Sequence, residues 1–140
     1  MIERVLDASI ALAWFLTDTE PRERFAFGVL EEMLSGRMEV WAPPIFPHEV
    51  AKGLVKAERR GTLSVSELEK ARVVLGGAEI QIHNQLLTID EMINAARQWH
   101  CQVYDATYVA LAVEQGLPLI TLDNGMREAC ERAGVMVQFP

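Results

Sequence analysis

Short apolar runs alternate along the chain with longer segments in which apolar residues recur three or four positions apart. Runs that end in turn-forming residues predict strands, and the longer periodic segments predict helices. The predicted strands are Ile2–Asp7, Met38–Ala42, Glu79–His83, Leu117–Leu122 and Val135–Phe139. The predicted helices are Ser9–Thr17, Pro21–Ser35, Phe46–Arg60, Ser64–Leu75, Thr88–Trp99, Tyr104–Gln115 and Asn124–Ala133.

This alternation of strands and helices predicts the class of fold. Strands that are separated by helices form βαβ units, in which the strands run parallel and the helices cover the sheet. We therefore expect a single domain over residues 1–140, with three α/β/α layers and a mainly parallel sheet of about five strands. In such sheets the functional residues lie beyond the carboxyl ends of the strands.

Two aspartates follow predicted strands directly. Asp7 ends the first apolar run, and Asp123 ends Leu119–Leu122, so both belong at the functional edge of the sheet. Each also precedes a predicted helix, where an aspartate commonly caps free backbone N–H groups. The sequence position alone leaves both roles open.

Asp105 and Glu49 are acids in mainly apolar surroundings. Asp105 is the only charged residue between Cys101 and Val113. A helix that is apolar on every side is buried, so this carboxylate needs a cap, a partner or a metal ion. Glu49 lies beside the apolar stripe of its own helix, where we favour a role as a metal ligand. An ion pair with Lys52 is the alternative for Glu49.

Acids on four separate elements are better explained together than one at a time. The four are Asp7, Glu49, Asp105 and Asp123. Hard divalent cations such as Mg²⁺ or Mn²⁺ bind oxygen ligands. Two such ions about 4 Å apart can activate water and stabilise the leaving oxygen of a phosphodiester. Without metal, the like charges of a shared site should raise at least one carboxyl pKa.

Other kinds of active site fit the sequence less well. The histidines His48, His83 and His100 show neither metal-binding spacing nor a Ser–His–Asp arrangement, and no glycine-rich phosphate loop is present. A phosphatase of the haloacid type would carry Asp-x-Asp after the first strand, but Asp7 is followed by Ala-Ser. A receiver domain needs a lysine after a late strand, and no lysine follows position 70.

The charge of the chain is unfavourable for binding nucleic acid, because phosphate contacts normally need Lys and Arg. The net charge is −7, and neutralising the four acids by metal ions would change it to −3. The alternative is that the negative charge only keeps the protein soluble.

The cysteines Cys101 and Cys130 form no disulfide framework, and neither a membrane span nor a signal peptide is evident. These features indicate a cytoplasmic protein.

Four short motifs share one family resemblance. The motifs are Val5–Ser9, Pro44–Val50, Tyr104–Ala112 and Leu119–Asp123. In this order they resemble the PIN domain, and more closely the VapC toxins of prokaryotic toxin–antitoxin pairs. The resemblance covers essentially the whole chain.

The resemblance implies a ribonuclease that depends on Mg²⁺ or Mn²⁺ and hydrolyses RNA with metal-activated water. The residues that match its catalytic metal site are Asp7, Glu49, Asp105 and Asp123. Ser9 and Thr121 become hydroxyls that hydrogen-bond the ligands or metal-bound water; helix capping and strand-end hydrogen bonding are the alternatives. The resemblance also implies homodimers and an antitoxin whose tail covers the site. A housekeeping RNA-processing nuclease and a non-catalytic binding module remain alternative functions.

A basic stripe follows the helix that carries Glu49. It consists of Lys52, Lys56, Arg59 and Arg60. Such a stripe can follow an RNA backbone towards bound metal ions, although basic residues also suit the carboxyl end of a helix. We favour RNA contact for Lys52 and Lys56.

Large apolar side chains are concentrated in the first two predicted helices. Trp14 and Phe15 are neighbours, about 100° apart around a helix, and Phe25 and Phe27 follow in Pro21–Ser35. One sheet surface cannot easily bury all of them in a chain this small. We expect some to stay exposed in an isolated subunit and to be covered by an antitoxin segment or a second subunit.

Overall fold

The sheet at the centre of the molecule has five parallel strands. The computed structural model describes residues 1–84 and 86–140 and places the strands in the order β3–β2–β1–β4–β5. The strands are β1 (Ile2–Leu6), β2 (Met38–Ala42), β3 (Ile80–Ile82), β4 (Leu119–Ile120) and β5 (Val137–Gln138). The predicted parallel sheet is confirmed.

Strand β1 lies between β2 and β4, and its carboxyl end is buried. Val5 is in register with Trp41 of β2 and with Leu119 of β4. Val5 and Leu6 have no exposed surface, as expected for a strand that is covered on both faces. Because chain order runs outward from β1 in both directions, the ends of β1 and β4 form the switch point where such folds place their sites.

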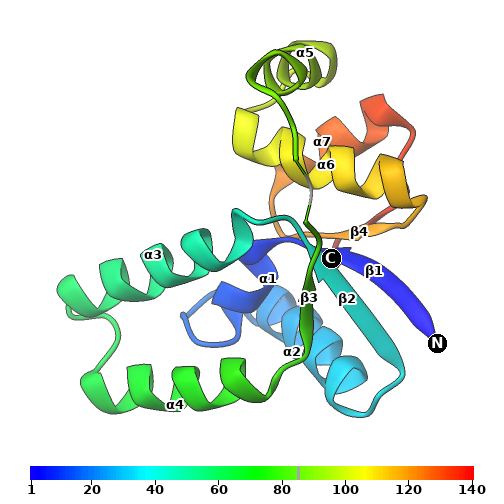
Figure 1. Ribbon diagram of the computed structural model, residues 1–140. Coiled ribbons are helices and arrows are strands. Elements are labelled where there is room, and N and C mark those ends of the chain that lie inside the picture. Colours follow the sequence, from blue (N-terminus) through cyan, green and yellow to red (C-terminus); the bar gives the residue numbers. More distant parts are fainter. Residues whose placement is uncertain (85) are drawn as a thin grey trace.

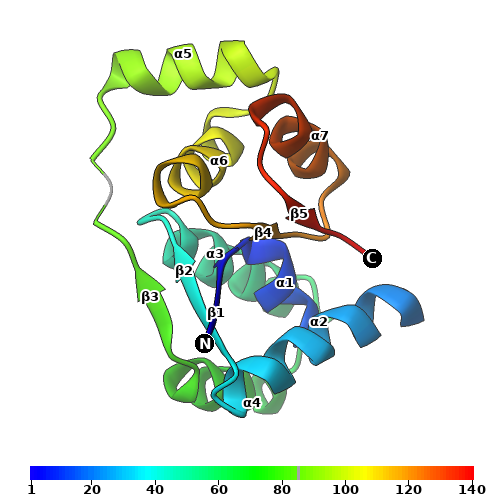
Figure 2. The same cartoon turned by 90° about the vertical axis from the view of Figure 1, so that its right-hand side faces the viewer.

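The helices form a layer on each side of the sheet. They are α1 (Ala8–Ala13), α2 (Glu20–Leu34), α3 (Phe46–Arg59), α4 (Val65–Gly77), α5 (Ile89–Trp99), α6 (Val103–Gln115) and α7 (Asn124–Ala133). Figures 1 and 2 show α5, α6 and α7 on one side and the other helices on the opposite side. The predicted α/β/α layers are confirmed. Within the described residues, no helix has the length and apolar character of a membrane span.

Local sequence signals explain where several helices begin and end. Helices α4 and α5 both begin with a capping box, formed by Ser64 with Glu67 and by Thr88 with Glu91. A cap of this kind stabilises a helix by about 1 kcal/mol. Helix α6 ends at Gly116, which has a φ of 65°, a left-handed conformation that glycine adopts without strain.

The first helix is shorter than predicted. The sequence predicts Ser9–Thr17, but α1 covers Ala8–Ala13. The backbone N–H groups of Trp14 and Phe15 bond to carbonyls three residues back, so the helix ends in a tightened turn. At this turn the indole of Trp14 is buried and its N–H donates to the carbonyl of Ala26 at 2.8 Å.

The last two strands are also shorter than predicted. Strand β4 ends at Ile120 because the backbone beyond it leaves the sheet to begin α7. The N–H of Leu122 donates to Ser9 Oγ, and that of Asp123 donates to Thr121 Oγ1. These bonds to side chains replace the ladder bonds of a longer strand.

The large apolar side chains of the first two helices are only partly covered. Trp14 is buried with 6% exposure, Phe15 and Phe25 are half-buried, and Phe27 is 47% exposed. The expectation that some of these side chains stay exposed in one subunit is confirmed by Phe27. Association through this region remains a prediction.

Candidate active site

One cleft brings together the acids that the sequence analysis selected. The cleft has a volume of about 450 Å³ and lies at the carboxyl ends of β1 and β4. The four acids are Asp7 after β1, Glu49 in the first turn of α3, Asp105 in the first turn of α6, and Asp123 after β4. The structure therefore places all the predicted site acids in one cleft.

Asp7 occupies the N-cap position of α1, but its side chain makes no capping hydrogen bond. Its Oδ2 instead accepts hydrogen bonds from Ser9 Oγ at 2.6 Å and from Thr121 Oγ1 at 2.8 Å. The aspartate is 6% exposed, so these hydroxyls replace the water that a buried carboxylate has lost. The capping alternative for Asp7 is therefore wrong.

The same two hydroxyls also accept hydrogen bonds from the backbone of the β4–α7 turn. Ser9 Oγ accepts from the N–H of Leu122 at 3.0 Å, and Thr121 Oγ1 accepts from the N–H of Asp123 at 2.9 Å. Each hydroxyl thus connects the carboxylate of Asp7 to the turn that carries Asp123. This network fixes two of the acids relative to each other, although they come from opposite ends of the chain.

Asp123 and Asp105 differ in their relation to the helices they begin. Asp123 is the N-cap of α7, and its Oδ1 accepts from the N–H of Gly125 at 3.1 Å. Capping is thus confirmed for Asp123, while its Oδ2 makes no hydrogen bond within the described residues. The N-cap of α6 is Gln102, so Asp105 lies inside the first turn and does not cap it.

Glu49 is held by a tyrosine from the opposite helix layer. The hydroxyl of Tyr108 donates to Glu49 Oε1 at 2.7 Å, and the tyrosine is completely buried in α6. The alternative ion pair with Lys52 is absent from the ion pairs of the described residues. Sequence reasoning missed Tyr108; its signal was the position three residues after Asp105, on the same side of the helix.

The carboxylates share a pattern that fits a hydrated divalent cation. In Asp7, Glu49 and Asp123, one oxygen accepts a protein hydrogen bond and the other accepts none from the described residues. Mg²⁺ binds such oxygens and usually keeps several of its waters. In the part of the chain that is described, no three His, Cys, Asp or Glu side chains are grouped closely enough to form a metal site by themselves. The carboxylate oxygens without a protein hydrogen bond suit a cation that keeps part of its water shell.

The cleft raises the pKa of two of its acids. The pKa of Asp7 is raised to about 6, mainly by burial and further by the charges of neighbouring carboxylates, while the hydroxyl hydrogen bonds lower it. The pKa of Asp105 is raised to about 7, again mainly by burial and then by the charges of the other three acids. Like charge was the expected cause, and burial is the larger one.

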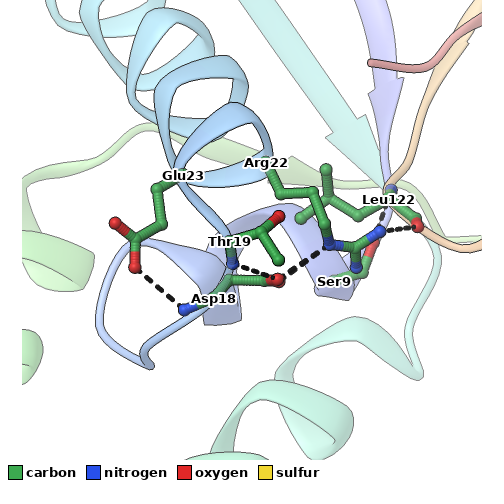
Figure 3. Close-up of polar contacts among 6 residues, drawn as sticks. All are labelled: Ser9, Asp18, Thr19, Arg22, Glu23 and Leu122. Carbon is green, nitrogen blue, oxygen red and sulfur yellow. Dashed lines mark hydrogen bonds and ion pairs between the residues drawn. The ribbon is translucent and has the colours of Figure 1, made fainter.

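Arg22 connects the site to α2, a helix that carries none of the acids. Its Nη1 donates to the carbonyl of Leu122 at 2.8 Å, and its Nε bonds both carboxylate oxygens of Asp18 at 2.9 and 3.0 Å (Figure 3). Since the N–H of Leu122 is bound by Ser9, both backbone groups beside Asp123 are held. Sequence reasoning missed Arg22, because its four-residue spacing from Asp18 is that of an ordinary helix ion pair.

Two lysines of the basic stripe reach the cleft. Lys52 and Lys56 line it together with the acids. With Arg59 and Arg60 they also line an adjoining surface hollow of about 570 Å³. None of these four side chains belongs to an ion pair among the described residues. The stripe therefore offers unpaired positive charge beside a negative cleft.

Comparison with known proteins gives a consistent relationship. The chain is 31% identical over 126 residues to Ribonuclease VapC3 of Pyrobaculum aerophilum, which covers 89% of this chain and 92% of that protein. The fold is similar to the crystal structure of PAE2754 from Pyrobaculum aerophilum, with a TM-score of 0.63, 21% identity, and 97% and 90% of the two chains covered. It is also similar to VapBC2 from Rickettsia felis, solved with a promoter DNA fragment, with a TM-score of 0.65, 16% identity, and 100% and 99% covered.

The model of the PIN domain family matches residues 4–132. This range includes the whole cleft, from Asp7 to Asp123. The chain therefore belongs to the PIN domain family.

Proposed function

We propose that the protein is an endoribonuclease that hydrolyses RNA phosphodiester bonds with Mg²⁺ or Mn²⁺ bound in the carboxylate cleft. The observation that carries this proposal is the meeting of four acids from four elements in one cleft at the switch point of the sheet. The similarity to a protein named Ribonuclease VapC3 supports the choice of RNA as substrate.

The proposed ligands are Asp7, Glu49, Asp105 and Asp123. When bound, a divalent cation supplies a water of lowered pKa and positive charge for the phosphodiester oxygens. Ser9 and Thr121 orient Asp7, and Tyr108 orients Glu49, each by engaging one oxygen and leaving the other available. These outer hydrogen bonds reduce the freedom of the ligands, which is how residues behind a metal site act.

Protons take part in loading the site. In the metal-free protein, the raised pKa values of Asp7 and Asp105, about 6 and 7, keep a fraction of both carboxyls protonated near neutral pH. A cation binds only the ionised form, so metal binding releases these protons. Activity should therefore need a higher metal concentration at pH 6 than at pH 8.

Lys52 and Lys56 are proposed to hold the RNA backbone. Both line the cleft, and neither is neutralised by a carboxylate among the described residues. Their charges can attract phosphates to a protein whose net charge is otherwise −7. The net negative charge is thus compatible with RNA as a substrate.

The similarity to VapC3 and to the VapBC2 complex supports a role as the toxin of a toxin–antitoxin pair. In this proposal a cognate antitoxin covers the site, the protein forms a homodimer, and it acts on RNA in the cytoplasm. A neighbouring gene for a short protein with a DNA-binding start supports the toxin role; its absence favours a housekeeping RNA-processing nuclease.

A cleavage assay tests the catalytic proposal. Total RNA is incubated with the protein and Mg²⁺, Mn²⁺ or a chelator. Asp7→Asn and Asp105→Asn should lower cleavage at least about 100-fold, since even residues behind metal ligands contribute 10- to 100-fold. They should fold as well as the wild type or better, because each removes a buried charge.

Asp90→Asn, an exposed aspartate of α5 outside the cleft, is the matched control and should cleave normally. Cleavage that persists in chelator, or in both cleft variants, contradicts the proposal. Lost cleavage accompanied by a lower melting temperature would point instead to a purely structural role. Metal binding without any cleavage would favour a binding module.

A further inference from the structure

A second cavity adjoins the carboxylate cleft. It has a volume of about 450 Å³, within the range of small-molecule sites. The β2–α3 connection, helix α3, the described residues Asn84, Leu86 and Leu87 before α5, and helices α5 and α6 contribute to its walls. Ile45, His48 and Tyr104 line both this cavity and the carboxylate cleft. The two spaces therefore lie next to each other, with these three side chains at their border.

Two of the shared residues come directly before acids of the cleft in the sequence. His48 precedes Glu49 on α3, and Tyr104 precedes Asp105 on α6. Neighbouring positions on a helix point about 100° apart, so the same first turns supply acids to one space and rings to the border of the other. A molecule bound at the acids is thereby placed next to Tyr104.

The chemistry of the second cavity differs from that of the cleft. None of its described lining residues is Asp, Glu, Lys or Arg, and apolar side chains such as Leu87, Met92 and Val103 form much of its wall. Among the described lining residues, no Lys or Arg offers a positive charge to phosphate. The wall suits an uncharged, flat and largely apolar group, and Tyr104, which lines both spaces, is 55% exposed.

We infer that this cavity binds one unpaired nucleobase of the RNA substrate, stacked on the ring of Tyr104. The inference rests on the proposed function. Proteins recognise single-stranded RNA by splaying bases out and stacking them on aromatic side chains. Here the phosphodiester lies at the acids, Lys52 and Lys56 hold the backbone, and the adjacent base turns into the neighbouring cavity. The cavity thus selects RNA whose bases are unpaired at the cut.

The test uses a single-stranded RNA oligonucleotide with one mapped cut, and versions with an abasic ribose at each nucleotide around it. In the wild type, one abasic position should lower kcat/KM roughly tenfold, the usual effect of losing one stacked base. Tyr104→Ala should cause the same loss on intact RNA and no further loss at that position. Tyr104→Phe keeps the ring and should restore most of the activity that Tyr104→Ala loses on intact RNA.

Val113→Ala is the matched control, because Val113 is an exposed apolar residue on the same helix, 48% exposed and outside both spaces. It should leave every oligonucleotide unaffected. A melting curve checks that Tyr104→Ala folds, as its exposure leads us to expect.

Binding separates failure of this inference from failure of the proposed function. Fluorescence anisotropy of labelled RNA is measured with Asp7→Asn, alone and combined with Tyr104→Ala. Suppose that the wild type cuts no RNA, but the combined variant binds intact RNA about tenfold more weakly than Asp7→Asn alone. The base site is then supported and the catalytic proposal is contradicted.

Three results overturn the inference. In the first, Tyr104→Ala binds and cuts all the oligonucleotides like the Val113→Ala control. In the second, Tyr104→Ala changes the mass in light scattering but not RNA cleavage, so the cavity is an interface with a second copy or another protein. In the third, the wild type neither binds nor cuts RNA, and both proposals fall together.

Discussion

Tyr108 is completely buried, and its hydroxyl donates a hydrogen bond to Glu49 of the carboxylate cleft. Burial raises the pKa of its phenol, and the charge of Asp7 and the hydrogen bond to Glu49 raise it further. The phenol therefore stays protonated and serves as a permanent donor. Its role is to position Glu49 rather than to exchange protons.

Tyr108→Phe tests this positioning role. Removing the hydroxyl should lower stability by about 1 kcal/mol, the net value of one hydrogen bond. The concentration of Mn²⁺ that gives half-maximal cleavage should rise about tenfold, because the second oxygen of Glu49 loses its orientation. A fall in melting temperature with an unchanged metal requirement would show that Tyr108 only fills the core.

Asp7 and Asp105 predict how the stability of the metal-free protein depends on pH. Their pKa values are about 6 and 7 in the folded state, against about 3.9 in an unfolded chain. The folded state therefore binds more protons than the unfolded state between these values. The free energy of unfolding falls as the pH rises through 6 and 7. In chelator, the melting temperature should rise from pH 8 to pH 5.5.

Asp105→Asn should reduce this rise, whereas the exposed control Asp90→Asn should keep it in full. An equal pH dependence in Asp105→Asn and the wild type would contradict the assignment. Adding Mg²⁺ at pH 8 should raise the melting temperature of the wild type by linkage, and of Asp105→Asn by less.

At the scale of elements, Arg22 is the contact that makes α2 relevant to the cleft. Helix α2 supplies no acid, yet its first turn holds the carbonyl of Leu122 between Thr121 and Asp123. Arg22 also forms an ion pair with Asp18. The two side chains are partly buried, with 37% exposure for Arg22 and 27% for Asp18. The helix thus holds the carbonyl of the same residue whose N–H is held by Ser9.

Arg22→Gln should therefore weaken the site more than the fold. Losing the contacts to Leu122 and Asp18 should lower stability by about 1 kcal/mol and raise the metal requirement several-fold. Arg24→Gln, which removes an exposed ion pair with Glu20 on the same helix, should change stability by less than about 0.5 kcal/mol. Equal effects of the two substitutions on the metal requirement would contradict this role.

The elements also show what the sequence predicts and what it does not. Helices α4 and α5 begin where Ser64 and Thr88 predict, because capping is a local interaction. Strand β4 is shorter than its apolar run, because its end depends on hydroxyls supplied by other parts of the chain. The acids could be predicted because their positions after strands and on helices are local features of the sequence. Tyr108 and Arg22 were missed, since their partners lie 59 and 100 residues away.

At the scale of the whole molecule, apolar surface remains on helices of both layers. Phe27 and Leu34 on α2 are 47% and 63% exposed, and Ile89 and Ile93 on α5 are 78% and 46% exposed. Exposed apolar patches of this kind usually mark interfaces. The region of the first two helices is the one that the sequence predicts to be covered.

Light scattering should give a mass of about twice the 15.7 kDa of one chain. Phe27→Ser should shift the protein towards the monomer, because it removes an apolar contact without disturbing the buried core. Ile93→Ser is the matched control on the opposite layer. If Ile93→Ser separates the subunits and Phe27→Ser does not, the interface lies on α5; a single-chain mass for the wild type at all concentrations removes the dimer altogether.

The hydrogen bond between Asp7 and Thr121 spans 114 positions of the chain, and this has a consequence for synthesis on the ribosome. A nascent chain carries Asp7 and its near partner Ser9 from the start, but the second partner, Thr121, is among the last residues to be made. The cleft cannot assemble until β4 has left the exit tunnel and paired with β1. Chains that stop before position 119 lack β4, Thr121 and Asp123, so the complete set of acids is present only after nearly the whole chain has been made.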